Sequence, residues 1–206
     1  MTQTTKRHSI LRRLGDQLRH LRDNRRGVAA IEFALIAPLL LCMYFVTMEV
    51  APAIDTSKKV GRSASMVADL ITQQREIKKA DLDAIMQIGN ATLIPYSRSK
   101  LKVTVTAIRI SAAPATATVA WSRRMDDGVF SRPFTVGASV TVPPALLLPD
   151  TFLIRVTSEL GYTPMIAWSE DSKRPLGLVA SFSKLNMSKT NHLRPRLGTT
   201  ITCTDC

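Results

Sequence analysis

The sequence predicts an α+β protein: a long N-terminal helix that includes one transmembrane span, then a domain with a roughly four-stranded antiparallel sheet and one or two packed helices. Three observations lead to this class. An apolar run fills residues 28–50, apolar residues at helical spacing follow it, and period-two alternation is prominent in the second half of the chain. With 206 residues, 45% hydrophobic and 21% charged, the chain can bury a core.

Residues 1–27 form a basic leader. Eight Lys and Arg stand there against two Asp, and the whole chain has a net charge of +12. Lys and Arg beside an apolar segment mark the cytoplasmic side, so we expect a cytoplasmic N-terminus. Apolar residues at helical spacing from Ile10 to Leu21 fit an amphipathic helix on the inner leaflet, and a leader whose charges only orient insertion is the simpler alternative. Nucleic acid is not expected as a partner, because the leader has no aromatic residues.

Residues 28–50 are long enough to cross a bilayer. At about 1.5 Å per residue the helix measures about 34 Å, against a hydrocarbon core of about 30 Å. A cleaved secretory signal is the competing interpretation. Its apolar region would be shorter, and the only cleavage-like string, Val50-Ala51-Pro52-Ala53, is a poor match.

Glu32 is the unusual residue of this run. A charged group at the centre of a membrane helix costs about 2.5–3.5 kcal/mol, and less near the boundary, so such residues are functional candidates. The alternative is that Glu32 extends toward the cytoplasmic headgroups one turn away. Its surroundings favour function: a basic cluster, Gly27, four small or apolar residues, then Glu32 and Phe33.

This arrangement resembles the prepilin processing signal, in which a membrane peptidase cuts after the glycine and leaves a glutamate as the fifth residue of the mature chain. The wider string "RRGVAAIEFALIAPLLL", with Pro38 in the helix, is similar to the TadE-like family of tight-adherence (Flp) pilus biogenesis proteins, regarded as pseudopilins. The specific part of the resemblance ends near Glu49, and the remainder agrees only in layout.

The resemblance implies processing between Gly27 and Val28 by a prepilin peptidase, and recognition and assembly through Glu32 and Phe33. Pro38 removes a backbone hydrogen bond of the helix, so a kink is expected there. The resemblance also implies a place in the bacterial inner membrane, with residues 51–206 as a periplasmic domain. The expected partners are membrane lipid, other pilin-like or pseudopilin subunits, and the inner-membrane pilus assembly machinery. In such an assembly the Glu32 carboxylate can pair with the Val28 ammonium of a neighbour, which offsets the desolvation of both charges.

Two helices are expected at the start of the domain. The first continues from the span with one apolar face, formed by Val60, Ser63, Ala64, Val67, Leu70 and Ile71. The second covers residues 81–93, with Asp81 as its N-cap and Pro95 after its end.

Strands are then expected in residues 100–111 and 115–124, joined by a turn at Ala113-Pro114. In the first, the alternation slips before Ile108. In the second, Trp121 falls on the same side as Ala117 and Val119. A long connection is expected in residues 125–149, with a short helix near 145–148. Two more strands are expected in residues 151–165 and 176–187, followed by an irregular tail in residues 191–206.

No enzymatic motif emerges, so no catalytic residue, cofactor or metal site is expected. The histidines are scattered at positions 8, 20 and 192, and the two S-x-x-K strings, at 97–100 and 181–184, lack the elements of a serine-lysine enzyme. Cys203 and Cys206 suit a disulfide in an oxidising compartment, with each other or with another subunit. The arginines 123, 124 and 155 predict a solvated face, or an electropositive surface facing acidic partners or the membrane.

Three functions remain after the sequence is read. The favoured one is a pseudopilin-like inner-membrane protein that is processed after Gly27 and acts in assembly of a tight-adherence (Flp) type IV pilus. The alternative is an uncleaved, signal-anchored periplasmic binding or scaffolding protein, in which Glu32 would be dispensable. A membrane-tethered enzyme is third, without a constellation of residues to support it.

Overall fold

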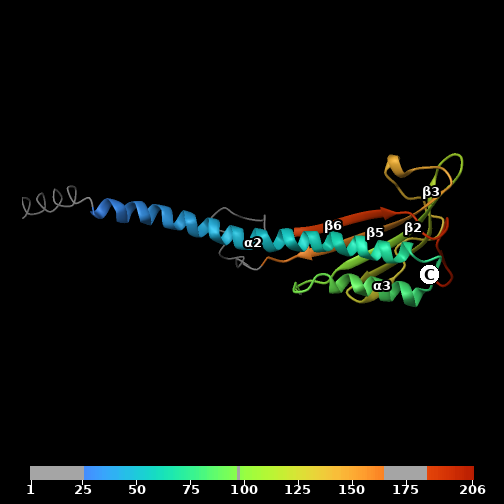
Figure 1. Ribbon diagram of the computed structural model, residues 1–206, viewed down its shortest axis with the longest axis horizontal. Helices are drawn as coiled ribbons and strands as arrows, with labels where there is room; N and C mark the ends of the chain where they lie inside the picture. Colours follow the sequence, from blue (N-terminus) through green and yellow to red (C-terminus); the bar gives the residue numbers. More distant parts are fainter. Residues whose placement is uncertain (1–25, 97, 165–184) are drawn as a thin grey trace, which may run out of the picture. The chain divides into compact units, whose positions relative to one another are not determined.

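The computed structural model describes residues 26–96, 98–164 and 185–206, and it divides the chain into two compact units, Met1–Val50 and Ala51–Cys206 (Figure 1). The amphipathic helix expected at residues 10–21 lies outside the described residues. Helix α2 (Arg26–Thr72) is continuous through Pro38 and Val50. We call its residues 28–50 the apolar half and its residues 51–72 the domain half.

The domain half of α2 confirms the predicted amphipathic continuation. Val60, Ala64, Val67 and Ile71 are completely buried, and they recur at the three- and four-residue intervals that place side chains on one face of a helix. Burying a side chain of this kind contributes about 1.5–3 kcal/mol. This face therefore makes residues 51–72 an integral part of the second unit, which we call the sheet domain.

Helix α3 (Lys79–Ala91) confirms the second predicted helix, but it begins two residues earlier than expected. Asp81 lies in its first turn and is not its N-cap, a position that Lys78 occupies without a side-chain cap. Leu82 and Met86 are buried on its inner face. At Gly89 the helix approaches α2 so closely that a Cβ atom would lie 2.7 Å from the Ser63 hydroxyl, and glycine permits this contact.

The sheet has five antiparallel strands, one more than the sequence predicted, in the order β4-β3-β2-β5-β6. Its strands are β2 (Lys102–Ile110), β3 (Ala117–Asp126), β4 (Val129–Ser131), β5 (Thr151–Tyr162) and β6 (Leu185–Leu193). The additional strand is β4. Asp127 and Gly128, with φ of 51° and 78°, form the two-residue turn that returns the chain from β3.

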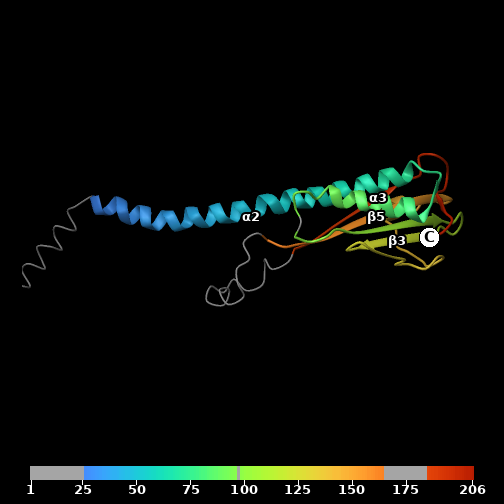
Figure 2. The same cartoon turned by 90° about the horizontal axis from the view of Figure 1, so that it is seen from below.

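The helices cover one face of the sheet, as Figure 2 shows for α3 and the domain half of α2. Val103, Val105 and Ala107 of β2 pack there with both helices in the main core. Ile108 and Ile110 belong to a second, smaller cluster, where Val140, Val142 and the residues near the short helix η1 (Pro144–Leu146) cover them. The slip before Ile108 therefore marks the point where the apolar side chains of β2 change from the face under the helices to the opposite face, and η1 confirms the predicted short helix.

A register shift in β3 corrects one prediction. Ala107 pairs with Trp121 and Ile108 pairs with Val119, so Ala120 is an extra residue between them. Because one extra residue reverses the side that a side chain faces, Trp121 packs in the main core under the helices. Ala117, in contrast, packs in the smaller cluster with Ile108.

The C-terminal part of the chain is more regular than predicted. Strand β6 occupies 185–193, later than the strand expected at 176–187, whose residues 176–184 lie outside the described part. In the tail, β7 (Thr202–Cys203) pairs in parallel with β1 (Glu76–Ile77). The tail is thereby held against the segment that joins α2 to α3.

Candidate functional site

The apolar half of α2 is the most exposed apolar surface of the described chain. Phe33 and Leu35 each expose 72% of their surface, and apolar side chains are exposed on all sides of the helix. The exposed large side chains are Val28, Ile31, Phe33, Leu35, Ile36, Leu39, Leu40, Leu41, Met43, Tyr44, Phe45, Val46, Met48 and Val50. α2 is long and apolar enough to cross a membrane. So continuous an apolar surface needs lipid or partner helices around it.

Glu32 is exposed within this surface, four residues after Val28, so the two lie on the same face of α2. No ion pair of Glu32 is found within residues 26–96, 98–164 and 185–206. Because removing a carboxylate from water without a partner costs several kcal/mol, a cation from outside the described residues would stabilise Glu32 in lipid.

Gly27 is the second residue of α2, so the Gly27–Val28 bond lies in the first helical turn. A glycine costs a helix about 1 kcal/mol relative to alanine. Gly27 therefore weakens the helix next to this bond.

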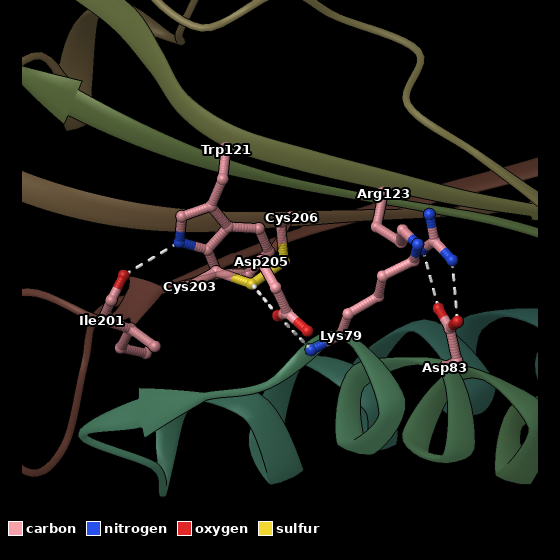
Figure 3. Close-up of a disulfide and its surroundings, with 8 residues drawn as sticks. All are labelled: Lys79, Asp83, Trp121, Arg123, Ile201, Cys203, Asp205 and Cys206. Atoms are coloured by element: carbon pink, nitrogen blue, oxygen red, sulfur yellow. Dashed lines mark hydrogen bonds and ion pairs between the residues drawn. A yellow bond between two sulfur atoms is a disulfide. The ribbon is translucent and has the colours of Figure 1, made fainter.

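Cys203 and Cys206 form a disulfide, with their Cα atoms 5.6 Å apart. Figure 3 shows the surroundings of this disulfide. Between the cysteines, the Asp205 carboxylate accepts a 2.7 Å hydrogen bond from the backbone N–H of Lys79, at the start of α3. On the other side, Trp121 Nε1 donates a 2.8 Å hydrogen bond to the Ile201 carbonyl. We call residues 201–206 the C-terminal clamp.

The Asp205 contact is the N-terminal cap that Lys78 and Asp81 do not supply. A carboxylate at a helix N-terminus satisfies a free N–H group and interacts favourably with the helix dipole. Asp205 is 126 positions away from Lys79 along the chain, so no local pattern indicates its role. The short disulfide loop holds this carboxylate in place.

Arg123 corrects the prediction of a solvated arginine face. It is only 9% exposed, it faces the helices, and its Nε and Nη2 atoms both donate 2.7 Å hydrogen bonds to the Asp83 carboxylate of α3 (Figure 3). The hydrogen bonds with Asp83 raise the pKa of Arg123 above its ordinary value, against the opposing effect of burial. The period-two alternation predicted that Arg123 lies in a strand. It could not reveal the partner, because Asp83 lies on helix α3, far away in the sequence.

The remaining sequence features are dispersed. Ser97, Ser181 and Lys184 of the S-x-x-K strings, and His8 and His20, lie outside the described residues. Lys100 is exposed and pairs with Asp127. Cys42 is a free, exposed thiol of the apolar half. The described geometry thus contains two groups of interest, the Gly27–Phe33 segment on α2 and the disulfide-closed clamp on the sheet domain.

Comparison with known proteins gave a match that includes the Gly27–Phe33 segment. Residues 27–69 match the family model described as TadE-like protein, which confirms the resemblance seen in the sequence for this segment. The match begins at Gly27, includes Glu32, and ends near the buried end of α2. Neither the curated proteins nor the solved structures gave a match.

Proposed function

We propose that this protein is a pseudopilin-like, single-pass inner-membrane protein that acts in assembly of a tight-adherence (Flp) type IV pilus. The observation that carries the proposal is the coincidence of three features on one helix. The TadE-like match, the exposed apolar half of α2, and a carboxylate five residues past Gly27 all fall within residues 27–69.

In the proposed mechanism, a prepilin peptidase cuts the Gly27–Val28 bond on the cytoplasmic side and frees the Val28 amine. Glycine at position 27 lowers the cost of the local helix opening that such a cut needs. The ammonium of one processed subunit then pairs with the Glu32 carboxylate of a neighbouring pilin-like subunit. Attraction between unit charges at about 4 Å grows from about 1 kcal/mol in water to several kcal/mol in a less polar environment, so the pair drives helix packing in lipid.

The role we propose is structural and not enzymatic. The apolar half supplies the packing surface for partner helices, and the sheet domain is the periplasmic part that accompanies it. The basic leader, eight Lys and Arg against two Asp, supports a cytoplasmic N-terminus. The competing function, an uncleaved signal-anchored periplasmic scaffold, uses the same helix only as an anchor.

Intact-mass analysis of the native protein, from cells with and without the prepilin peptidase, tests the proposal. We expect a mature chain beginning at Val28 in competent cells and an unprocessed chain in cells that lack the peptidase. A full-length chain in competent cells would support the uncleaved anchor instead.

The same cells carrying Glu32→Gln separate processing from assembly. This variant keeps the side-chain shape and removes the charge, so the sheet domain should fold normally while pilus formation falls at least tenfold. Asp55→Asn is the matched control, because Asp55 is exposed and its i,i+4 pair with Lys59 is of the kind that contributes about 0–1 kcal/mol. Equal pilus yields from both variants would contradict the role of Glu32.

A further inference from the structure

A polar cavity of about 280 Å³ lies on the sheet face opposite the helices. Side chains from four adjacent strands line it, and the strand register fixes their neighbours. Thr104 of β2 lies between Arg124 of β3 and Thr157 of β5. One step along the sheet, Thr106 lies beside Arg155, which in turn lies beside His192 of β6.

Arg155 is the central charge of this cavity. It is partly buried, and its Nη1 atom donates a 3.2 Å hydrogen bond to the Thr141 carbonyl of the connection that covers the face. Its guanidinium carbon lies 5.9 Å from the centre of the Phe134 ring. Burial lowers the pKa of Arg155 below its ordinary value. No ion pair of Arg155 occurs within the described ranges, so its desolvated charge lacks a counter-ion there.

The cavity also offers hydrogen-bond donors to a ligand. Arg124 donates from Nε to the Thr104 hydroxyl at 3.2 Å, which leaves its other N–H groups available. The one carboxylate of the lining, Glu159, already has Lys102 at 3.9 Å. The buried Thr106 hydroxyl and the His192 Nε2 atom have no partner among the described residues. Such a lining suits a ligand that carries several acceptor oxygens.

We propose that this cavity binds a small oxyanion, a carboxylate or phosphate group, with Arg155 as its principal partner and Arg124 beside it. The anion supplies the counter-ion that Arg155 lacks among the described residues. A planar guanidinium can hold two oxygens of such a group at once, which gives direction as well as affinity. The site is separate from the apolar half of α2 and goes beyond the role in pilus assembly proposed above.

His192 gives the site a pH dependence. Burial, and then the nearby charge of Arg155, lower the pKa of His192 below its ordinary value, so the ring is neutral in the empty site near pH 7. A bound anion favours the protonated ring and raises that pKa. Binding should therefore strengthen as the pH falls below 7. The other charges facing this region are Arg124 and Glu159, with Lys102 next to Glu159.

The test uses the full-length protein in a nonionic detergent. Thermal unfolding is followed while inorganic phosphate, acetate or a short poly-aspartate peptide is added, with sodium chloride at equal ionic strength as the reference. A ligand that binds the folded state raises the unfolding temperature in a saturable way. Saturation by phosphate or acetate identifies a free anion as ligand, and saturation by the peptide alone identifies the acidic side chain of a partner protein.

Arg155→Gln is the decisive variant, and Arg109→Gln is its matched control. Both remove one charge from the same sheet, but Arg109 is exposed and does not line the cavity. We expect Arg155→Gln to weaken binding at least tenfold, Arg155→Lys to weaken it less, and Arg109→Gln to leave it unchanged. Near-UV circular dichroism confirms that each variant is folded.

Two results would overturn the proposal. One is the absence of saturable stabilisation of the wild-type protein by all three ligands. The other is an equal effect of the Arg155 and Arg109 substitutions. Either outcome leaves the cleavage after Gly27 untouched, so failure here is distinguishable from failure of the proposed function.

Discussion

The two halves of helix α2 differ in the way their apolar residues are arranged. In the domain half, apolar side chains occupy one face and are completely buried, as Val60 and Val67 illustrate. In the apolar half they surround the helix and remain exposed, as Phe33 and Leu35 illustrate. One continuous helix therefore carries two surfaces, one matched to a protein core and one suited to lipid or partner helices.

The largest expected effect comes from placing the same charge in each half. Val67→Asp buries an unpaired carboxylate in the main core, and it should destabilise the sheet domain by more than about 4 kcal/mol. Val46, which is 56% exposed, is the matched site. Val46→Asp should leave the unfolding temperature of the domain unchanged but weaken membrane insertion by about 2.5–3.5 kcal/mol.

Thermal unfolding in detergent, followed by near-UV circular dichroism, measures the first effect, and the membrane-bound fraction after cell lysis measures the second. The comparison between the halves breaks down if Val46→Asp unfolds the domain, or if Val67→Asp leaves it intact.

A second prediction concerns the ion pair that joins α3 to the sheet. Arg123→Met leaves Asp83 as a partly buried, unpaired carboxylate, and it should lower the free energy of unfolding by about 3 kcal/mol. The double variant with Asp83→Leu should lose less than the two single variants together, because neither charge then remains unpaired. Additive losses in denaturant titrations would show that the pair is not coupled. Membrane insertion should be unaffected throughout.

The smallest effect is expected at the C-terminal clamp. The cysteines are three positions apart, and closing so short a loop contributes about 2 kcal/mol or less. Cys203→Ser with Cys206→Ser should lower the stability of the sheet domain by that amount, measured by denaturant unfolding. Asp205→Asn, which retains the disulfide and weakens only the cap on α3, should cost about 1 kcal/mol. A double cysteine variant as stable as the wild type would show that the clamp does not depend on its disulfide.

Local patterns predicted those parts of the fold that local physics determines. The helical spacing from Val60 to Ile71 gave the domain half of α2, and period-two alternation gave β2, β3 and β5. The slip at Ile108 also proved informative, because it marks where the apolar side chains of β2 change from one face of the sheet to the other. The predictions failed where pairing or contacts with residues far away in the sequence determine the structure. The extra residue Ala120 moved Trp121 to the other face, and Asp205 took the capping role assigned to Asp81.

The candidate sites divide in the same way. The Gly27–Phe33 segment is a contiguous string, so the sequence was sufficient to find it and the match at residues 27–69 agrees. The Arg123–Asp83 pair and the cavity around Arg155 are formed by strands and helices far apart in the chain. Consecutive side chains of a strand face opposite sides of the sheet, and this explains why Arg123 is paired under the helices while Arg124 lines the cavity.

Cys42 provides the most direct test of the central claim, that the apolar half of α2 lies in lipid. It is a free thiol of that half, and Cys203 and Cys206 are joined in a disulfide. A charged maleimide is added to membrane fragments that are open on both faces, and the reference is Cys42→Ala with Lys58→Cys, whose new thiol lies at an exposed position of the domain half. We predict rapid labelling of the reference, and labelling of Cys42 only after detergent or denaturant is added. Equally rapid labelling of both thiols in intact membranes would contradict the account.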